Sequence, residues 1–167
     1  MDKKYELTQE TINVDGHTLY RIRALRSFSN IIAEELGGFI ESEDNLSHDG
    51  NCWVFENARV YENAQVSKSG RLYQKAQVSG NAKVSDYAHI FGNAQVSGNA
   101  KVFGDNWIGN DARVSGDAWI AMPFVFPGQY WIGGTSYITS GTWQRIIRIG
   151  GRRYMISTTL HKILMLP

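Results

Sequence analysis

Aliphatic residues recur at every sixth position through the middle of the chain, without a change of phase. They are Val54, Val60, Val66, Leu72, Val78, Val84, Ile90, Val96, Val102, Ile108, Val114 and Ile120. A small residue stands two positions before eleven of these twelve, and Asn or Asp often stands one position earlier still. Low-complexity disorder does not fit this pattern, because twelve aliphatic side chains in one phase are available to bury.

A six-residue unit of this kind supplies one short strand and one corner. The β-branched residue points inward, alanine fits where the chain crowds the axis, and Asn, Asp or Gly tolerates the left-handed backbone of a corner. Three units close one triangular coil, and coils stack about 4.8 Å apart as parallel strands. The repeats from about Asn51 to Met122 therefore predict a parallel β-helix of about four coils.

The repeat resembles that of the hexapeptide-repeat superfamily, whose members form left-handed β-helices and usually assemble as trimers. Ahead of the repeat, residues 37–41 and 45–54 resemble the leading segment of YdcK-like proteins and of short hexapeptide proteins common in phages and their hosts. The resemblance covers roughly residues 20–120. It implies left-handed coils and a homotrimer, and it says little about chemistry.

Both ends of the chain depart from the repeat. Residues 11–20 alternate around Asp15 and Gly16, which is the signature of a hairpin, and we expect this hairpin to cap the first coil. After Ile120 the period stops at Met122 and Pro123, and short strand-like runs follow. We therefore predict an all-β chain with an N-terminal cap over residues 1–48, the β-helix over 49–122 and a small C-terminal β module over 123–167.

The last fifty residues are basic, although the formal net charge of the whole chain is only +1. They contain no acidic residue. One arginine side chain can bind two phosphate oxygens at once, and aromatic rings stack on nucleotide bases. We therefore predict a site for a phosphorylated aromatic small molecule such as a nucleotide. The alternative is a basic surface without a specific ligand. This basic surface is small for a nucleic-acid partner. The predicted ligand residues are Arg145, Arg148, Arg152, Arg153, Trp131, Tyr137, Trp143 and Tyr154.

Positions eighteen apart stack on one face of such a β-helix, and one face collects aromatic side chains. They are Trp53, Phe55, Tyr73, His89, Phe91 and Trp107. An apolar strip of this size is either a subunit interface or a platform on which a ligand stacks, and we assign it to the interface. His89 is also the candidate catalytic base, since a histidine between subunits serves that role in hexapeptide acyltransferases. His17, His48 and His161 lie outside the repeat.

Several classes of protein are disfavoured by the sequence. Cysteine pairs, His-x-x-x-His and phosphate-loop motifs are absent, so we predict no metal site and no cofactor. The single cysteine, Cys52, occupies a small-residue position of the repeat and is expected to be buried. The sequence contains no run of eighteen apolar residues and no apolar stretch near Met1, which favours a cytoplasmic location.

Three functions follow from these features. The first is a non-catalytic, homotrimeric binding protein for a nucleotide-like ligand; in a phage, it would sequester a host nucleotide signal as an anti-defence protein. The second is an acyltransferase that uses acetyl-coenzyme A, against which stand the small number of coils and the missing histidine motif. The third is a purely structural trimer.

Overall fold

The computed structural model describes residues 3–120 and, beyond them, the backbone of strands at 125–126, 131–132, 137–138, 144–149, 152–157 and 162–165. One turn of 3-10 helix, η1 (Glu43–Asn45), interrupts a chain whose other described elements are strands. The predicted all-β class is therefore confirmed.

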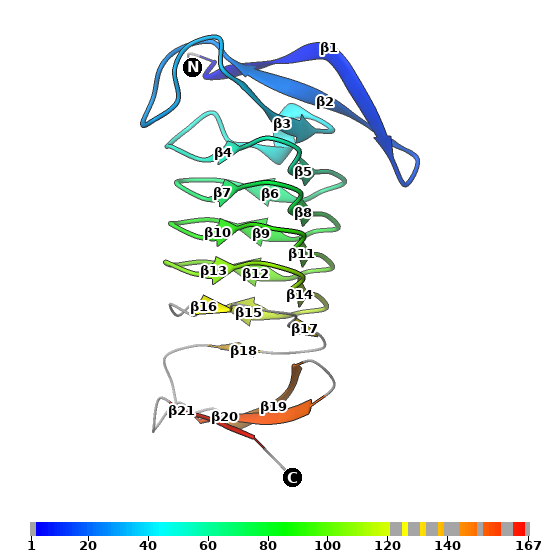
Figure 1. Ribbon diagram of the computed structural model, residues 1–167, viewed down its shortest axis with the longest axis vertical. Helices are drawn as coiled ribbons and strands as arrows, with labels where there is room; N and C mark the ends of the chain where they lie inside the picture. The colour runs from blue at the N-terminus through cyan, green and yellow to red at the C-terminus, as the bar shows by residue number, and fades with distance from the viewer. Residues whose placement is uncertain are drawn as a thin grey trace.

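Twelve two-residue strands form the stacked coils in Figure 1, beginning with β4 (Trp53–Val54) and ending with β15 (Trp119–Ile120). Each pairs in parallel with the strand one coil away, so the coils build three sheets. All twelve predicted aliphatic residues are buried, with at most 1% of their surface exposed. The result is the left-handed parallel β-helix that the resemblance implies. The strands between its ends are β5 (Arg59–Val60), β6 (Gln65–Val66), β7 (Arg71–Leu72), β8 (Gln77–Val78), β9 (Lys83–Val84), β10 (His89–Ile90), β11 (Gln95–Val96), β12 (Lys101–Val102), β13 (Trp107–Ile108) and β14 (Arg113–Val114).

The β-helix has about five coils, one more than the sequence predicts. Strands β16 (Val125–Phe126), β17 (Trp131–Ile132) and β18 (Tyr137–Ile138) pair in parallel with β13, β14 and β15. Their aliphatic and aromatic positions keep the six-residue phase, but two prolines and the loss of the preceding alanines hide it. A separate antiparallel sheet follows, made of β19 (Gln144–Ile149), β20 (Arg152–Ser157) and β21 (Lys162–Met165).

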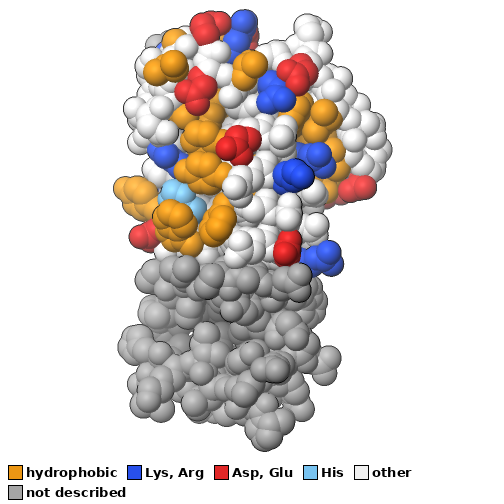
Figure 2. Space-filling model, in the orientation of Figure 1, with side chains coloured by type: hydrophobic (Ala, Val, Ile, Leu, Met, Phe, Trp, Pro, Cys, Tyr) orange, Lys and Arg blue, Asp and Glu red, His pale blue; other side chains and the backbone are white. Residues whose placement is uncertain are grey.

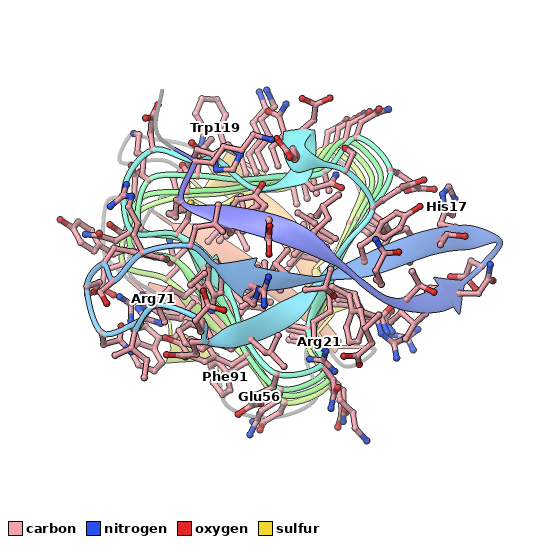
Figure 3. All side chains as sticks on the ribbon, turned by 90° about the horizontal axis from the view of Figure 1, so that it is seen from above. His17, Arg21, Glu56, Arg71, Phe91 and Trp119 are labelled. Carbon is pink, nitrogen blue, oxygen red and sulfur yellow. The ribbon has the colours of Figure 1, made fainter. Side chains whose placement is uncertain are left out.

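The N-terminal strands cover the open end of the first coil, as predicted. β1 (Tyr5–Val14) and β2 (His17–Ala24) form an antiparallel hairpin, and β2 also pairs with β3 (Leu36–Ile40). Because β3 pairs in parallel with β5, this cap is continuous with one sheet of the β-helix. Figure 3, seen from above, shows the cap strands lying across the triangular opening. The cap thereby satisfies the backbone groups that an open coil would expose.

The corners match the expectation where Gly, Asp or Asn is in left-handed conformation, and they differ from it at Glu56, Glu62, Lys68 and Gln74. The residue in left-handed conformation is the second one after each aliphatic, for example Glu56 with φ 54° and Gly80 with φ 68°. The asparagines next to these corners have another role, which is to bond to each other from coil to coil. Asn63 donates to Asn81 at 3.1 Å, and Asn81 donates to Asn99 at 3.0 Å. The asparagine ladder therefore ties the coils together along the outside.

Candidate functional site

Aromatic rings line the outside of the sheet formed by β4, β7, β10 and β13. We call Phe55, Tyr73, His89, Phe91 and Trp107 the aromatic strip. Neighbouring ring centroids are 4.5 Å apart for Phe55 and Tyr73, 5.9 Å for Tyr73 and His89, and 4.4 Å for His89 and Trp107, with planes within 15° of parallel. Figure 2 shows hydrophobic side chains gathered along one side of the β-helix, with a histidine among them.

The strip presents mainly ring edges to the outside, because stacked rings cover each other's faces. Its members are half-buried, apart from Trp107, which is 44% exposed. A flat ligand needs a free ring face on which to stack, whereas a protein surface packs well against ring edges. The geometry therefore favours the assignment of the strip to an interface over a ligand platform.

The ring of Phe91 lies directly over Gly109 of the next coil. A Cβ atom at Gly109 would lie 2.0 Å from Cζ of the Phe91 ring, so only glycine leaves room for the ring. The Trp107 ring meets Phe91 edge-on, with centroids 6.1 Å apart. A glycine eighteen positions after an outward aromatic residue is the sequence signal for this close contact.

Trp53, which the sequence placed on the outward face, does not reach the surface. Its side chain is fully buried, and its ring meets Tyr5 and Phe28 edge-on, with centroid distances of 6.2 Å and 5.5 Å. The prediction that Trp53 belongs to an exposed interface is corrected, because the cap folds over this first coil. Coil stacking alone cannot show which outward positions an appended segment covers.

His89 lies between the rings of Tyr73 and Trp107. Burial is the main cause that lowers the pKa of His89 below its ordinary value; the nearby Arg71 guanidinium lowers the pKa further, and Asp105 opposes both. Its Nδ1 atom is buried and has no hydrogen-bond partner among the described residues. A catalytic base is normally oriented by a hydrogen bond to its second ring nitrogen. The surroundings of His89 therefore suit an interface residue better than a general base.

The predicted ligand residues lie on the later strands, and only their backbone positions are described. Trp131 is in β17 and Tyr137 in β18, which are strands of the fifth coil. The four arginines are in β19 and β20, where Arg148 is the cross-strand partner of Arg153. Tyr154 is also in β20. The strand pairing sets Arg148 opposite Arg153, whereas Arg145 is opposite Ile156 and Arg152 is opposite Ile149. Trp143 lies outside the described residues.

Cys52 is buried, as its place in the repeat predicts, and it has an unexpected neighbour. The Nζ atom of Lys4, which is itself fully buried, lies 3.3 Å from Cys52 Sγ and donates to the Cys52 carbonyl at 3.0 Å. Burial raises the pKa of the Cys52 thiol and lowers the pKa of Lys4. His48 also belongs to the cap, where its ring stacks on Tyr5 at 4.3 Å. His161 lies outside the described residues.

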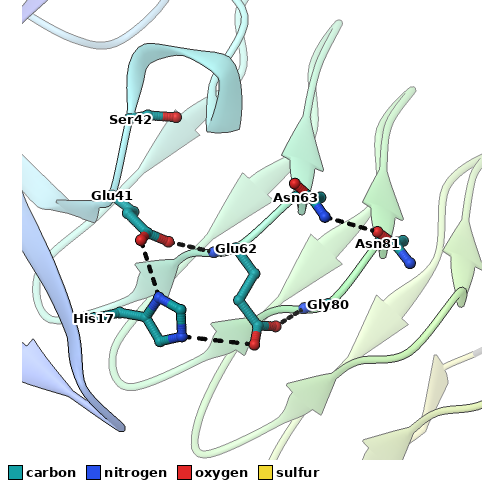
Figure 4. A pocket seen from close by; sticks show the side chains of 7 residues that line it. All are labelled: His17, Glu41, Ser42, Glu62, Asn63, Gly80 and Asn81. Carbon is teal, nitrogen blue, oxygen red and sulfur yellow. Dashed lines mark hydrogen bonds and ion pairs between the residues drawn. The ribbon is translucent and has the colours of Figure 1, made fainter.

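A shallow cleft of about 600 Å³ lies where the cap hairpin meets the first coils (Figure 4). His17 Nδ1 lies 2.9 Å from Glu41 Oε1, and His17 Nε2 lies 3.7 Å from Glu62 Oε1. Glu41 also accepts a 2.6 Å hydrogen bond from the Glu62 backbone, and Glu62 accepts one from Gly80. The imidazole thus joins the hairpin to one corner of the first coil, which is a structural role.

The stability of the cap is expected to fall as pH rises through the pKa of His17. The hydrogen bond to Glu41 is the main cause that raises the pKa of His17 above its ordinary value of 6.5 in the folded state. Its stabilising contribution is therefore complete below about 6.5 and is lost as pH rises through the higher folded pKa. Urea unfolding between about pH 6 and about pH 9 checks this, with His17→Gln as control. A pH dependence that is equal in the variant and the wild type would contradict it.

The repeat and the stacked coils form a β-solenoid that is consistent with a hexapeptide-repeat β-helix. Part of the chain is 34% identical over 74 residues to a protein of Escherichia coli strain K12 named "Uncharacterized acetyltransferase YdcK". That match covers 39% of this chain and 23% of the relative, so it spans under a quarter of the relative's length. No family model matches the chain.

The described part of the chain contains neither a side-chain arrangement typical of a metal site nor a helix typical of a membrane span. No group of three or more His, Cys, Asp or Glu side chains there is arranged to hold a metal ion. Within the same residues, no helix is long and apolar enough to cross a membrane.

Proposed function

We propose that this chain is a non-catalytic, homotrimeric β-helix binding protein whose ligand is a phosphorylated aromatic small molecule of the nucleotide type. The observation that supports this class of ligand is the strand pair β19 and β20, which contains four arginines and no acidic residue. Arg148 and Arg153 stand directly opposite each other across this pair. Like charges in opposed positions are destabilising, and a bound phosphate offsets the repulsion.

The aromatic strip supports the trimer. It runs along several coils, its rings are already stacked on each other, and its edges are apolar. A strip of this kind is suited to contact between copies of the chain. If the chain derives from a phage, such a trimer would sequester a host nucleotide signal.

The proposal is tested on protein purified from an expressing cell. We expect light scattering to give the mass of three chains at micromolar concentration. We also expect mass spectrometry of the supernatant, after the protein is denatured, to detect a nucleotide-like anion. A mass of one chain in light scattering would contradict the homotrimer. Turnover of acetyl-coenzyme A that is abolished by His89→Ala would replace the proposal with the acyltransferase suggested by the name of the relative.

Replacing Arg152 or Arg153 with alanine is expected to remove ligand binding without weakening the free protein. Exposed ion pairs contribute only about 0–1 kcal/mol, so the melting temperature without ligand should hardly change. A nucleotide that binds the folded state raises the melting temperature by mass action, and this rise should disappear in both variants. Lys162→Ala, in the neighbouring strand β21, serves as the control. If both variants melt earlier without ligand and no nucleotide stabilises the wild type, a purely structural trimer is the better description.

A further inference from the structure

Arg113 is an exposed cation next to the strands that contain the predicted ligand residues. It lies on β14, and its in-register neighbour on the next coil is Trp131 of β17. Strand β17 also contacts β19, which contains Arg145 and Arg148. Figure 1 shows β17 with β14 above it and β19 below it. The strand order therefore places Arg113 beside the proposed ligand site, on the same sheet as one of its predicted aromatic residues.

The Arg113 guanidinium has no carboxylate partner in the part of the chain that the structure describes. None of the ion pairs found there involves it. The acidic residues nearest to it in sequence are Asp111 and Asp117, and both accept hydrogen bonds from asparagines one coil earlier. Asn93 donates to Asp111 at 3.0 Å, and Asn99 donates to Asp117 at 2.9 Å. The guanidinium is therefore available to an anionic ligand.

The row of side chains that includes Arg113 differs in charge from coil to coil. Gln95 and Gln77 occupy the same position on the two preceding coils and are neutral. Arg59, the first member of the row, lies beside Phe39 of the cap and is half-buried. Among the described members of this row, the exposed cation is thus the one on the coil nearest to β17.

We infer that Arg113 is a further ligand-binding residue and that the ligand carries more than one phosphate group. The inference rests on the proposed function, since it extends the same site. Arg113 raises the number of arginines there from four to five, and strands β14, β17, β19 and β20 contain no acidic residue. One phosphate monoester carries a charge of only about −1.5 to −2 near neutral pH, which leaves most of the positive charge without compensation. A nucleoside diphosphate or triphosphate compensates more of it.

The test measures binding of the monophosphates and triphosphates of adenosine and guanosine to the full-length protein by calorimetry, without added divalent cation. The wild type is expected to bind a triphosphate more tightly than the matching monophosphate. Arg113→Gln should weaken the triphosphate about tenfold, because it removes one charge-assisted contact, and should change the monophosphate less than about threefold. Arg26→Gln, the same change at an exposed arginine of the cap, is the matched control and should bind every probe like the wild type.

The outcomes separate this inference from the proposed function. If Arg152→Ala abolishes binding and Arg113→Gln binds the triphosphates like the wild type, the inference is overturned and the proposed function stands. A lower melting temperature of free Arg113→Gln would then give Arg113 a structural role. Equal weakening of monophosphates and triphosphates by Arg113→Gln would overturn the assignment of more than one phosphate. If the wild type binds none of the probes at millimolar concentration, both the inference and the proposed ligand are rejected.

Discussion

A Phe91→Glu variant is expected to be monomeric under conditions in which the wild-type protein is trimeric. Phe91 lies over Gly109 and against Trp107, so a carboxylate at this position would enter an apolar part of the aromatic strip. Burying an unpaired charge at an interface costs several kcal/mol, and a threefold assembly would bury three of them. Because a micromolar dissociation constant corresponds to only about 8 kcal/mol, such a cost is enough to dissociate the assembly. Light scattering at micromolar concentration measures the change in mass.

Ser97→Glu is the matched control for this variant. Ser97 follows Val96 on β11 as Phe91 follows Ile90 on β10, so the same charge is placed at the same repeat position on another face. The control should remain trimeric, and circular dichroism should show that both variants keep the β-helix. A Phe91→Glu protein that is still trimeric would show that the aromatic strip is not the interface, although the fold would be unaffected.

The core of the β-helix could be predicted because the one aliphatic residue in each six-residue repeat shows which side chains point inward. An aliphatic residue such as Ile90 is fully buried whatever the identity of its outward neighbours. The repeat therefore fixes the phase of every strand from β4 to β15, and the order of the sheets follows from three strands per coil. The repeat did not predict the fifth coil because Pro123 stands where Asn or Asp is usual, Pro127 directly follows Phe126, and the alanines that precede the aliphatic positions are missing.

The outward positions were harder to predict, since their environment depends on segments far away in sequence. Trp53 and Phe55 occupy neighbouring outward positions, but the cap buries the first completely and leaves the second half-exposed. The stacking of His89 on Trp107 followed from the eighteen-residue spacing, whereas the burial of its Nδ1 atom did not.

Asn45 closes the junction between the cap and the first coil with four hydrogen bonds. Its Oδ1 atom accepts from the backbone N–H groups of Glu41 at 3.1 Å and Ser42 at 2.9 Å. Its Nδ2 group donates to the carbonyls of Glu62 and Ala64, each at 2.9 Å. The side chain is buried, with 1% exposed, so all of its hydrogen-bonding capacity is used inside the protein.

Asn45→Ala is therefore expected to cause the largest loss of stability of any single polar substitution considered for this chain. It leaves backbone donors and acceptors at the junction without partners, and such groups cost about 1–3 kcal/mol each when buried. Since water can reach some of them, we expect the free energy of unfolding to fall by about 3–4 kcal/mol, measured by urea denaturation. Asn63→Ala, which removes one exposed bond of the asparagine ladder, should cost less than about 1 kcal/mol. A loosened cap also uncovers the edge of the first coil, so the Asn45 variant should aggregate during refolding while the Asn63 variant should not. Equal stability of the two variants would mean that the cap is held by its apolar contacts and that this hydrogen-bonded junction contributes little.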